Sequence, residues 1–325
     1  MQNYRTHLFV FFVAVAALGA AALLLAARPG YGQSPDSQNL STAAPQAAEP
    51  SLQPTALVRE RRAESAPASD FARNFAEAAT RNSLLRYELT WAFGGKQQRG
   101  WHLYTPLISR LVGAEVEATT NDFASALSRW QTTTGLKPSG VLDDETLYQM
   151  VAAWQGARLK DKSYPTPDRL LLAPASDFYD PSRPEQLRQV ERETYAAYKR
   201  MVAAALADPS LGLKGTMEGG LAPEEKYLKI VSSFRSREYQ EHLRRQSPHS
   251  GRAGLAVHSP HFTGRALDIY VGGEPVETKD SNRALQVQTR VYQWLVRNAD
   301  RFGFRPYYYE PWHWEYTGES TAGNK

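Results

Sequence analysis

The stretch Ser259-Pro-His-Phe-Thr-Gly-Arg-Ala-Leu-Asp-Ile-Tyr-Val-Gly-Gly273 joins a turn to an apolar run and carries two side chains that can bind a metal. Residues 266–271 are typical of a strand that ends at two glycines, and Thr263-Gly264-Arg265 supplies a turn before it. His261 and Asp268 are seven positions apart, an odd offset that places residues of one regular strand on opposite faces. We therefore expect His261 to lie on a loop that folds back over the strand carrying Asp268.

A second segment, Glu310-Pro-Trp-His313, adds an imidazole and a carboxylate. Glu310 and His313 also have an odd offset. Pro311 is expected to interrupt regular strand pairing there, so a local bend could bring both side chains toward one cavity. The chain has only seven histidines, which makes the concentration of imidazoles in these two segments notable.

Together the two segments have the composition of a catalytic zinc site. If His261, Asp268 and His313 bind Zn2+, a fourth coordination position is left for water, whose pKa zinc lowers to about 7. Glu310, near the metal without being a ligand, could accept the water proton and deliver it to a leaving amine. Arg235, at the end of an expected strand, could add positive charge for an oxyanion or a substrate carboxylate.

Helices and strands alternate around these segments without a regular βαβ pattern. This favours an α+β fold, with a small antiparallel sheet and flanking helices over residues 185–318. The further elements expected are a helix starting at Pro184, a strand over 227–234, a helix over 237–245, a helix that includes Leu285 and Leu295 and stops at Gly303, and a strand over 304–316 broken at Pro311.

The pattern Ser259-x-His261-x2-Gly264-x-Ala266-x-Asp268, followed by Glu310-x-Trp312-His313, resembles the zinc D-alanyl-D-alanine carboxypeptidases of the VanY type, part of the LAS metallopeptidase group. The segment Ser232-Ser-Phe-Arg235-Ser236-x3-Gln240 resembles the upstream arginine segment of that family, with serine and phenylalanine where glycine and tyrosine are common. The resemblance covers roughly residues 187–317.

The resemblance implies a role for each matching residue. His261, Asp268 and His313 would be zinc ligands, Glu310 the catalytic base, and Arg235 a contact to the substrate or its oxyanion. The residues implied to support the site or contact substrate are Ser259, Ser236, Gln240 and Trp312.

The implied reaction is hydrolysis at D-alanine in the stem peptides of peptidoglycan. An L,D-carboxypeptidase, an endolysin-like endopeptidase and a non-catalytic cell-wall-binding protein stay open as alternatives. A serine D,D-peptidase is excluded, because the chain has no Ser-x-x-Lys motif.

Residues 70–156 are expected to form a small helical domain. Phe123, Leu127 and Trp130 recur at helical spacing, with Asp122 as the expected N-cap, and a turn-rich loop over 135–146 opens another helix. About 35 residues here resemble the three-helix type of peptidoglycan-binding domain. Trp130 is interpreted as a core residue, with a sugar contact as the alternative.

The remaining segments concern location and linkage. Residues 1–28 contain an uncharged apolar run of about 20 residues, long enough to cross a bilayer of roughly 30 Å, and are interpreted as a signal anchor or a cleaved signal peptide. Residues 29–69 have the composition of a disordered linker, residues 157–184 form a connector, and 319–325 a tail. The protein is therefore expected to be exported, either anchored in the membrane and facing the periplasm or cell wall, or secreted.

Composition restricts the partners. No cysteine is present, so disulfides and cysteine-based metal sites or nucleophiles are excluded. The formal charge of +4 comes without a dense basic run interleaved with aromatics, so no nucleic-acid partner is predicted. Peptidoglycan and the membrane are the expected partners, and the sequence leaves the oligomeric state open.

Overall fold

The computed structural model describes residues 68–93, 96–114, 117–246 and 259–318. The predicted signal segment at 1–28, the tail at 319–325 and most of the linker at 29–69 lie outside the described residues. Ala68 and Ser69, predicted to end that linker, belong to the first helix instead. Along the described residues, no helix has both the length and the apolar character that crossing a membrane requires.

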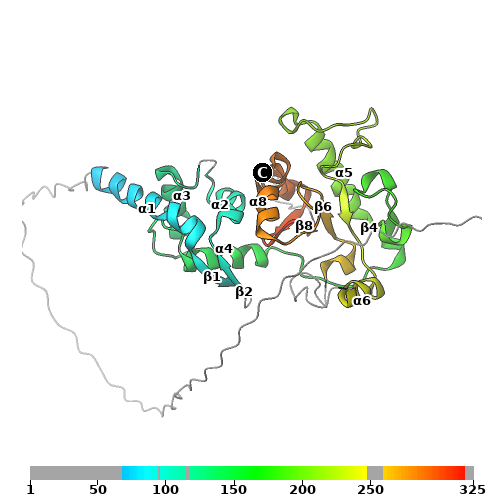
Figure 1. Ribbon diagram of the computed structural model, residues 1–325, viewed down its shortest axis with the longest axis horizontal. Coiled ribbons are helices and arrows are strands. Elements are labelled where there is room, and N and C mark those ends of the chain that lie inside the picture. The colour runs from blue at the N-terminus through cyan, green and yellow to red at the C-terminus, as the bar shows by residue number, and fades with distance from the viewer. Residues whose placement is uncertain (1–67, 94–95, 115–116, 247–258, 319–325) are drawn as a thin grey trace, which may run out of the picture. The chain divides into compact units, whose positions relative to one another are not determined.

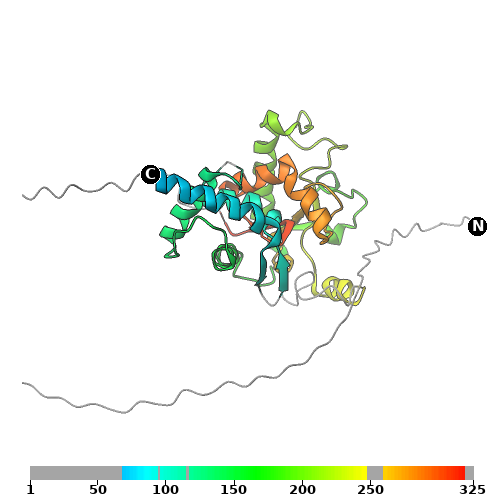
Figure 2. The same cartoon turned by 60° about the vertical axis from the view of Figure 1, so that its left-hand side comes forward.

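The part of the chain predicted as helical, 70–156, does consist mainly of helices. They are α1 (Ala68–Glu88), α2 (Thr105–Val112), α3 (Asn121–Thr133) and α4 (Asp144–Gly156). An unpredicted hairpin of β1 (Thr90–Phe93) and β2 (Lys96–Arg99) follows α1 directly (Figure 2). Trp91 of β1 is buried, and its indole nitrogen donates to the carbonyl of Gly100 at 2.9 Å.

Local capping explains where α3 and α4 begin. The predicted N-cap Asp122 is wrong, because the Thr120 hydroxyl accepts from the backbone nitrogen of Phe123 and Asp122 lies in the first turn. Asp143 caps α4 in the same way. Phe123 and Leu127 are fully buried, whereas Trp130 is only partly buried against the core.

The connector 157–184 has more structure than its sequence suggests. It contains two 3-10 turns, η2 (Pro167–Arg169) and η3 (Ala175–Asp177), and the strand β3 (Leu170–Leu172). Strand β3 pairs antiparallel with β4 (Gln189–Glu191), which follows the 3-10 turn η4 (Glu185–Leu187). The predicted helix start at Pro184 is therefore wrong. Helix α5 (Arg192–Leu206) begins only after β4, where the Glu191 carboxylate accepts from the Thr194 backbone nitrogen.

The main sheet has four antiparallel strands in the order β5-β6-β8-β7, of which Figure 1 labels β6 and β8. Its strands are β5 (Ile230–Ser232), β6 (Ala266–Ile269), β7 (Phe304–Tyr307) and β8 (Glu310–Tyr316). Among the described residues of this part, the helices after α5 are α6 (Arg237–Gln246), α8 (Asp280–Gln288) and α9 (Arg290–Asn298). The predicted α+β class, with a small antiparallel sheet, is confirmed.

Three predicted elements differ in their limits. The strand expected over 227–234 is shortened, since Leu228 takes a positive φ of 67°, which a regular strand does not allow. The helix expected to include Leu285 and Leu295 is two helices, because Thr289 is extended and caps α9. The strand expected over 304–316 is two strands, since the chain turns between β7 and β8; Pro311 lies within β8, and the pairing with β7 shifts register there, between Trp314 and Glu310.

The described residues belong to one compact unit. Within the described residues, one apolar cluster takes in Trp101 and Leu147 from the helical part together with Trp314 and Tyr292 from the part around the main sheet. The domain boundaries predicted between residues 156 and 157 and between residues 184 and 185 stay predictions. The buried apolar cluster includes residues on both sides of each boundary.

Candidate metal centre

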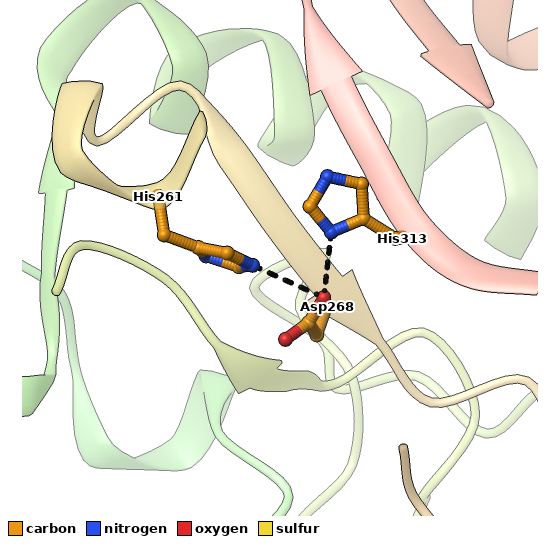
Figure 3. A group of neighbouring side chains, drawn as sticks. All are labelled: His261, Asp268 and His313. Carbon is orange, nitrogen blue, oxygen red and sulfur yellow. Dashed lines mark hydrogen bonds and ion pairs between the residues drawn. The ribbon is translucent and has the colours of Figure 1, made fainter. Parts of the chain in front are cut away.

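Three of the predicted residues, His261, Asp268 and His313, lie together at the middle of the main sheet (Figure 3). Asp268 on β6 and His313 on β8 are paired in the antiparallel register, so their side chains lie on the same face. His261 comes from the 3-10 turn η6 (Pro260–Thr263), which precedes β6. The predicted loop that returns over the strand is therefore present.

The turn that carries His261 is held at both ends. The Ser259 hydroxyl accepts from the His261 backbone nitrogen at 3.3 Å, and Gly264 ends the turn with a φ of 69°. A β-carbon at Gly264 would lie 3.0 Å from both the Glu191 backbone nitrogen and a methyl carbon of Leu170. Glycine is thus favoured both by the positive φ and by the limited space.

The ligand atoms of the three side chains lie within 4.8 Å of one another, and all three residues are buried. Oδ1 of Asp268 lies 3.3 Å from Nε2 of His261 and 3.0 Å from Nδ1 of His313. Among the described residues this is the one group of histidine and acidic side chains close enough to share an ion.

The outward nitrogen of each imidazole also has an oxygen partner. Nδ1 of His261 lies 2.7 Å from the carbonyl oxygen of Ser233, and Nε2 of His313 lies 3.2 Å from Oε1 of Glu315. The inward nitrogens, Nε2 of His261 and Nδ1 of His313, both face Oδ1 of Asp268. With an ion on these two nitrogens, each neutral ring carries its proton on the outward nitrogen, where Ser233 and Glu315 accept it.

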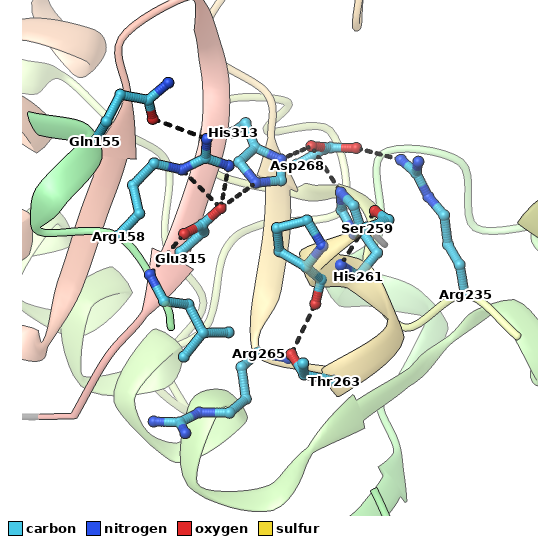
Figure 4. Close-up of polar contacts among 12 residues, drawn as sticks. Gln155, Arg158, Arg235, Ser259, His261, Thr263, Arg265, Asp268, His313 and Glu315 are labelled. Carbon is cyan, nitrogen blue, oxygen red and sulfur yellow. Dashed lines mark hydrogen bonds and ion pairs between the residues drawn. The ribbon is translucent and has the colours of Figure 1, made fainter. Parts of the chain in front are cut away.

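Glu315 is a residue that the sequence analysis missed. It is fully buried, and it receives hydrogen bonds from Arg158 in addition to the contact with His313 (Figure 4). Burial raises the pKa of the Glu315 carboxyl, but His313 and Arg158 outweigh it and lower the pKa to about 2. One signal was present in the sequence: residues 313 and 315 of one strand share a face.

Arg235 contacts the centre through Asp268. Its Nη2 donates to Oδ2 of Asp268 at 2.6 Å, and its Nε donates to the Ser232 hydroxyl at 3.0 Å. The guanidinium therefore holds one oxygen of Asp268 and leaves the other facing the two histidines. The sequence analysis considered a contact to substrate or oxyanion for Arg235 and did not predict this buried ion pair.

The charged state of the centre follows from these contacts. Burial raises the pKa of Asp268, but His261, His313 and Arg235 together hold it well below its ordinary value. Burial and the nearby Arg235 lower the pKa of His261 to about 4. Burial also lowers the pKa of His313, but hydrogen bonds to Asp268 and Glu315 outweigh it and raise the pKa to about 9.

Glu310 begins β8 and is buried near these charges. Burial raises its pKa to about 7, with Asp268 acting in the same direction and His313 and Arg235 opposing it. A register shift between Pro306 and Tyr307 separates Glu310 from the regular pairing farther along β8.

The other predicted site residues occupy different positions. Trp312 is buried in the core. Ser236 caps α6, since its hydroxyl accepts from the Tyr239 backbone nitrogen at 3.1 Å, and Gln240 is buried in the same helix. Ser236 and Phe234 line a separate cavity of about 530 Å³, whereas Arg235 between them reaches Asp268.

The comparison with known families bears on this part of the chain. Residues 187–319 match the family model of VanY, D-alanyl-D-alanine carboxypeptidase. No curated protein matches the chain. Residues 187–319 are thus a VanY-type carboxypeptidase domain, and the activity that the family supports is that of a peptidoglycan peptidase. The VanY family is typically metal-dependent, and the match includes His261, Asp268 and His313.

Proposed function

We propose that the protein is a zinc-dependent carboxypeptidase that releases the terminal D-alanine from peptidoglycan stem peptides. The observation that carries the proposal is the approach of His261 Nε2 and His313 Nδ1 to one oxygen of Asp268, beside a buried glutamate, within a VanY-type region.

The donor set fits zinc. Two imidazole nitrogens and one carboxylate oxygen, with a further position open, are typical of catalytic zinc sites and unlike the all-oxygen sites of magnesium or calcium. His261, Asp268 and His313 would hold the ion. When bound, zinc would polarise the scissile carbonyl and acidify a water molecule.

The remaining chemistry belongs to the protein's own side chains. Glu310 would take a proton from the attacking water and return it to the leaving amine. Because burial raises its pKa to about 7, the carboxyl can both accept and donate a proton near neutral pH. Arg235 would keep Asp268 in place through their ion pair, and Ser259 would hold the turn of His261.

Location and the role of the helical part belong to the same proposal. Peptidoglycan lies outside the cytoplasm, which agrees with an exported protein whose residues 1–28 serve as a signal peptide or anchor. If residues 70–156 bind the wall, they would raise the local concentration of substrate around the catalytic residues.

The proposal is tested with a synthetic stem pentapeptide ending in D-Ala-D-Ala and the purified, zinc-loaded protein. Mass spectrometry should show loss of one alanine, and a peptide ending in D-Ala-L-Ala serves as the control substrate. Cleavage before the penultimate residue would favour an L,D-peptidase, and cleavage only of cross-linked muropeptides would favour an endopeptidase. If neither pentapeptides nor muropeptides are cleaved, the proposed activity is wrong.

The Glu310→Gln variant tests the catalytic base. It should keep its zinc, measured by plasma mass spectrometry, and lose hydrolysis by roughly 10²–10⁴-fold because a positioned base contributes about that much. Glu193→Gln, at an exposed carboxylate of the same region, is the matched control and should retain activity. Full activity of Glu310→Gln would reject Glu310 as the base.

A further inference from the structure

The carboxylate of Glu315, which contacts His313, accepts hydrogen bonds from residues that lie outside the VanY-type region. Nε of Arg158 donates to Oε1 of Glu315 at 3.0 Å, and Nη2 of Arg158 also donates to that oxygen. The backbone nitrogen of Leu159 donates to Oε2 at 2.9 Å. Arg158 and Leu159 follow Ala157, the C-cap of helix α4, and precede the matched residues 187–319.

Arg158 is itself fixed by two further contacts. Its Nη1 donates to Oε1 of Gln155, in the last turn of α4, at 2.9 Å (Figure 4). Its guanidinium lies 4.0 Å from the ring centroid of Tyr307 on β7. Because Gln155 and the ring of Tyr307 both contact the guanidinium, its donors are kept in one orientation. This limits the rotation of the Glu315 carboxylate.

The orientation of Glu315 determines which nitrogen of His313 faces the centre. With an ion on Nδ1, the neutral ring carries its proton on Nε2, where the Glu315 oxygen at 3.2 Å accepts it and holds the ring in place. Nδ1 is the nitrogen 3.0 Å from Asp268. Groups that orient a histidine ligand in this way typically change metal affinity by 10–100-fold when they are removed.

We propose that Arg158 and Glu315 form a positioning pair that fixes His313 for metal binding, so that the metal site extends into the segment at the end of α4. The inference rests on the proposed metal-dependent function. It adds a requirement that the VanY-type region does not meet by itself: two donors from residues 158 and 159 must be in place for His313 to be oriented.

The test is the zinc affinity of the full-length protein, measured by competition with a chromophoric chelator. Arg158→Ala should weaken zinc binding by about 10–100-fold. Arg158→Lys should give a smaller loss, because an ammonium keeps the charge but lacks the fork that reaches Glu315 twice. The matched control is Arg110→Ala, since the exposed pair Arg110–Asp300 also joins the helical part to the VanY-type region. Its zinc affinity should equal that of the unchanged protein.

A double variant shows whether Arg158 acts through Glu315. Glu315→Gln should weaken zinc binding, and adding Arg158→Ala to it should change the affinity little further. Losses that multiply in the double variant would overturn the proposed pathway. If Arg158→Ala does not fold, Arg158→Lys alone and combined with Glu315→Gln provide the same comparison. Unchanged zinc affinity in folded Arg158 variants would overturn the inference.

These outcomes are separate from those of the proposed function. If the unchanged protein releases D-alanine while the Arg158 variants bind zinc normally, the positioning pair is wrong and the peptidase stands. If zinc affinity falls as expected but the unchanged protein cleaves no peptide, the positioning pair stands and the proposed peptidase does not.

Discussion

The two histidines of the centre have pKa values that shift in opposite directions because their charged neighbours differ. Both are buried, which lowers the pKa of each imidazole. His261 also lies near the positive charge of Arg235, and its pKa falls to about 4. His313 lies between two carboxylates, Asp268 and Glu315, and its pKa rises to about 9. Metal binding at His313 is therefore expected to release a proton at neutral pH.

Glu310 is expected to destabilise the metal-free protein above neutral pH. Its pKa is raised from 4.5 to about 7, so between these pH values the folded state holds a proton that the unfolded state has released. The free energy of unfolding should fall as pH rises through this window. Above pH 7, Glu310→Gln should be more stable than the unchanged protein, by on the order of 3 kcal/mol.

Urea unfolding of the metal-free protein and of Glu310→Gln between pH 5 and 8.5 measures this difference. The gap between the two curves should widen with rising pH. A gap of constant size across the range would mean that the carboxyl of Glu310 titrates normally.

At the scale of elements, the centre depends on one strand pairing and one turn. Pairing of β6 with β8 places Asp268 opposite His313, and the η6 turn brings His261 to the same face. The turn must end in a left-handed residue packed against β4 and β3, because Gly264 lies next to Glu191 and Leu170. A substitution of Gly264 is therefore expected to weaken metal binding.

Gly264→Ala should destabilise the protein and weaken zinc binding. Gly212→Ala is the matched control, since Gly212 also ends a 3-10 turn with a positive φ of 62° but has open space around it. The control should lose about 1–2 kcal/mol from backbone conformation alone and keep its zinc affinity. Gly264→Ala should lose on the order of 1 kcal/mol more from crowding. Equal effects of both substitutions on stability and zinc affinity would contradict the role of the turn.

At the scale of the molecule, polar contacts and a common core join the helical part to the VanY-type region. Arg283 on α8 is buried, donates to the hydroxyl of Tyr104 at 2.9 Å, and lies 4.2 Å from the ring centroid of Tyr309. Tyr104 belongs to the 3-10 turn before α2. Because a buried guanidinium requires partners, unfolding of one part would leave costly unpaired groups in the other.

Tyr104→Phe should therefore destabilise both parts together, by about 1–3 kcal/mol, because it leaves Arg283 without that acceptor. In urea, circular dichroism and tryptophan fluorescence should show one common transition that moves to lower urea concentration. Tyr148→Phe, at an exposed tyrosine of α4, is the control and should leave the midpoint unchanged. Two separate transitions, with only one of them shifted, would show that the parts unfold independently.

Several features were predictable from local sequence. The α+β class, the convergence of His261, Asp268 and His313, and the helix over 237–245 all follow from short motifs or periodicity. The helix expected at Pro184 failed because β4 pairs with a strand in the preceding connector, which periodicity does not report. Pro311 does not end β8, but the expected interruption of regular pairing is present: β6 pairs only with residues 313–315, and the pairing with β7 shifts register between Trp314 and Glu310.

The sequence by itself determined which side chains can bind a metal and which family they resemble, since both depend on residue types at short spacing. Only the tertiary structure decided what holds those side chains in place. Arg158 and Glu315 are separated by 157 positions, and no spacing rule connects residues so far apart. Their contact depends on the packing of α4 and its following segment against the sheet, because burial brings the two charges together and then requires each to pair with the other.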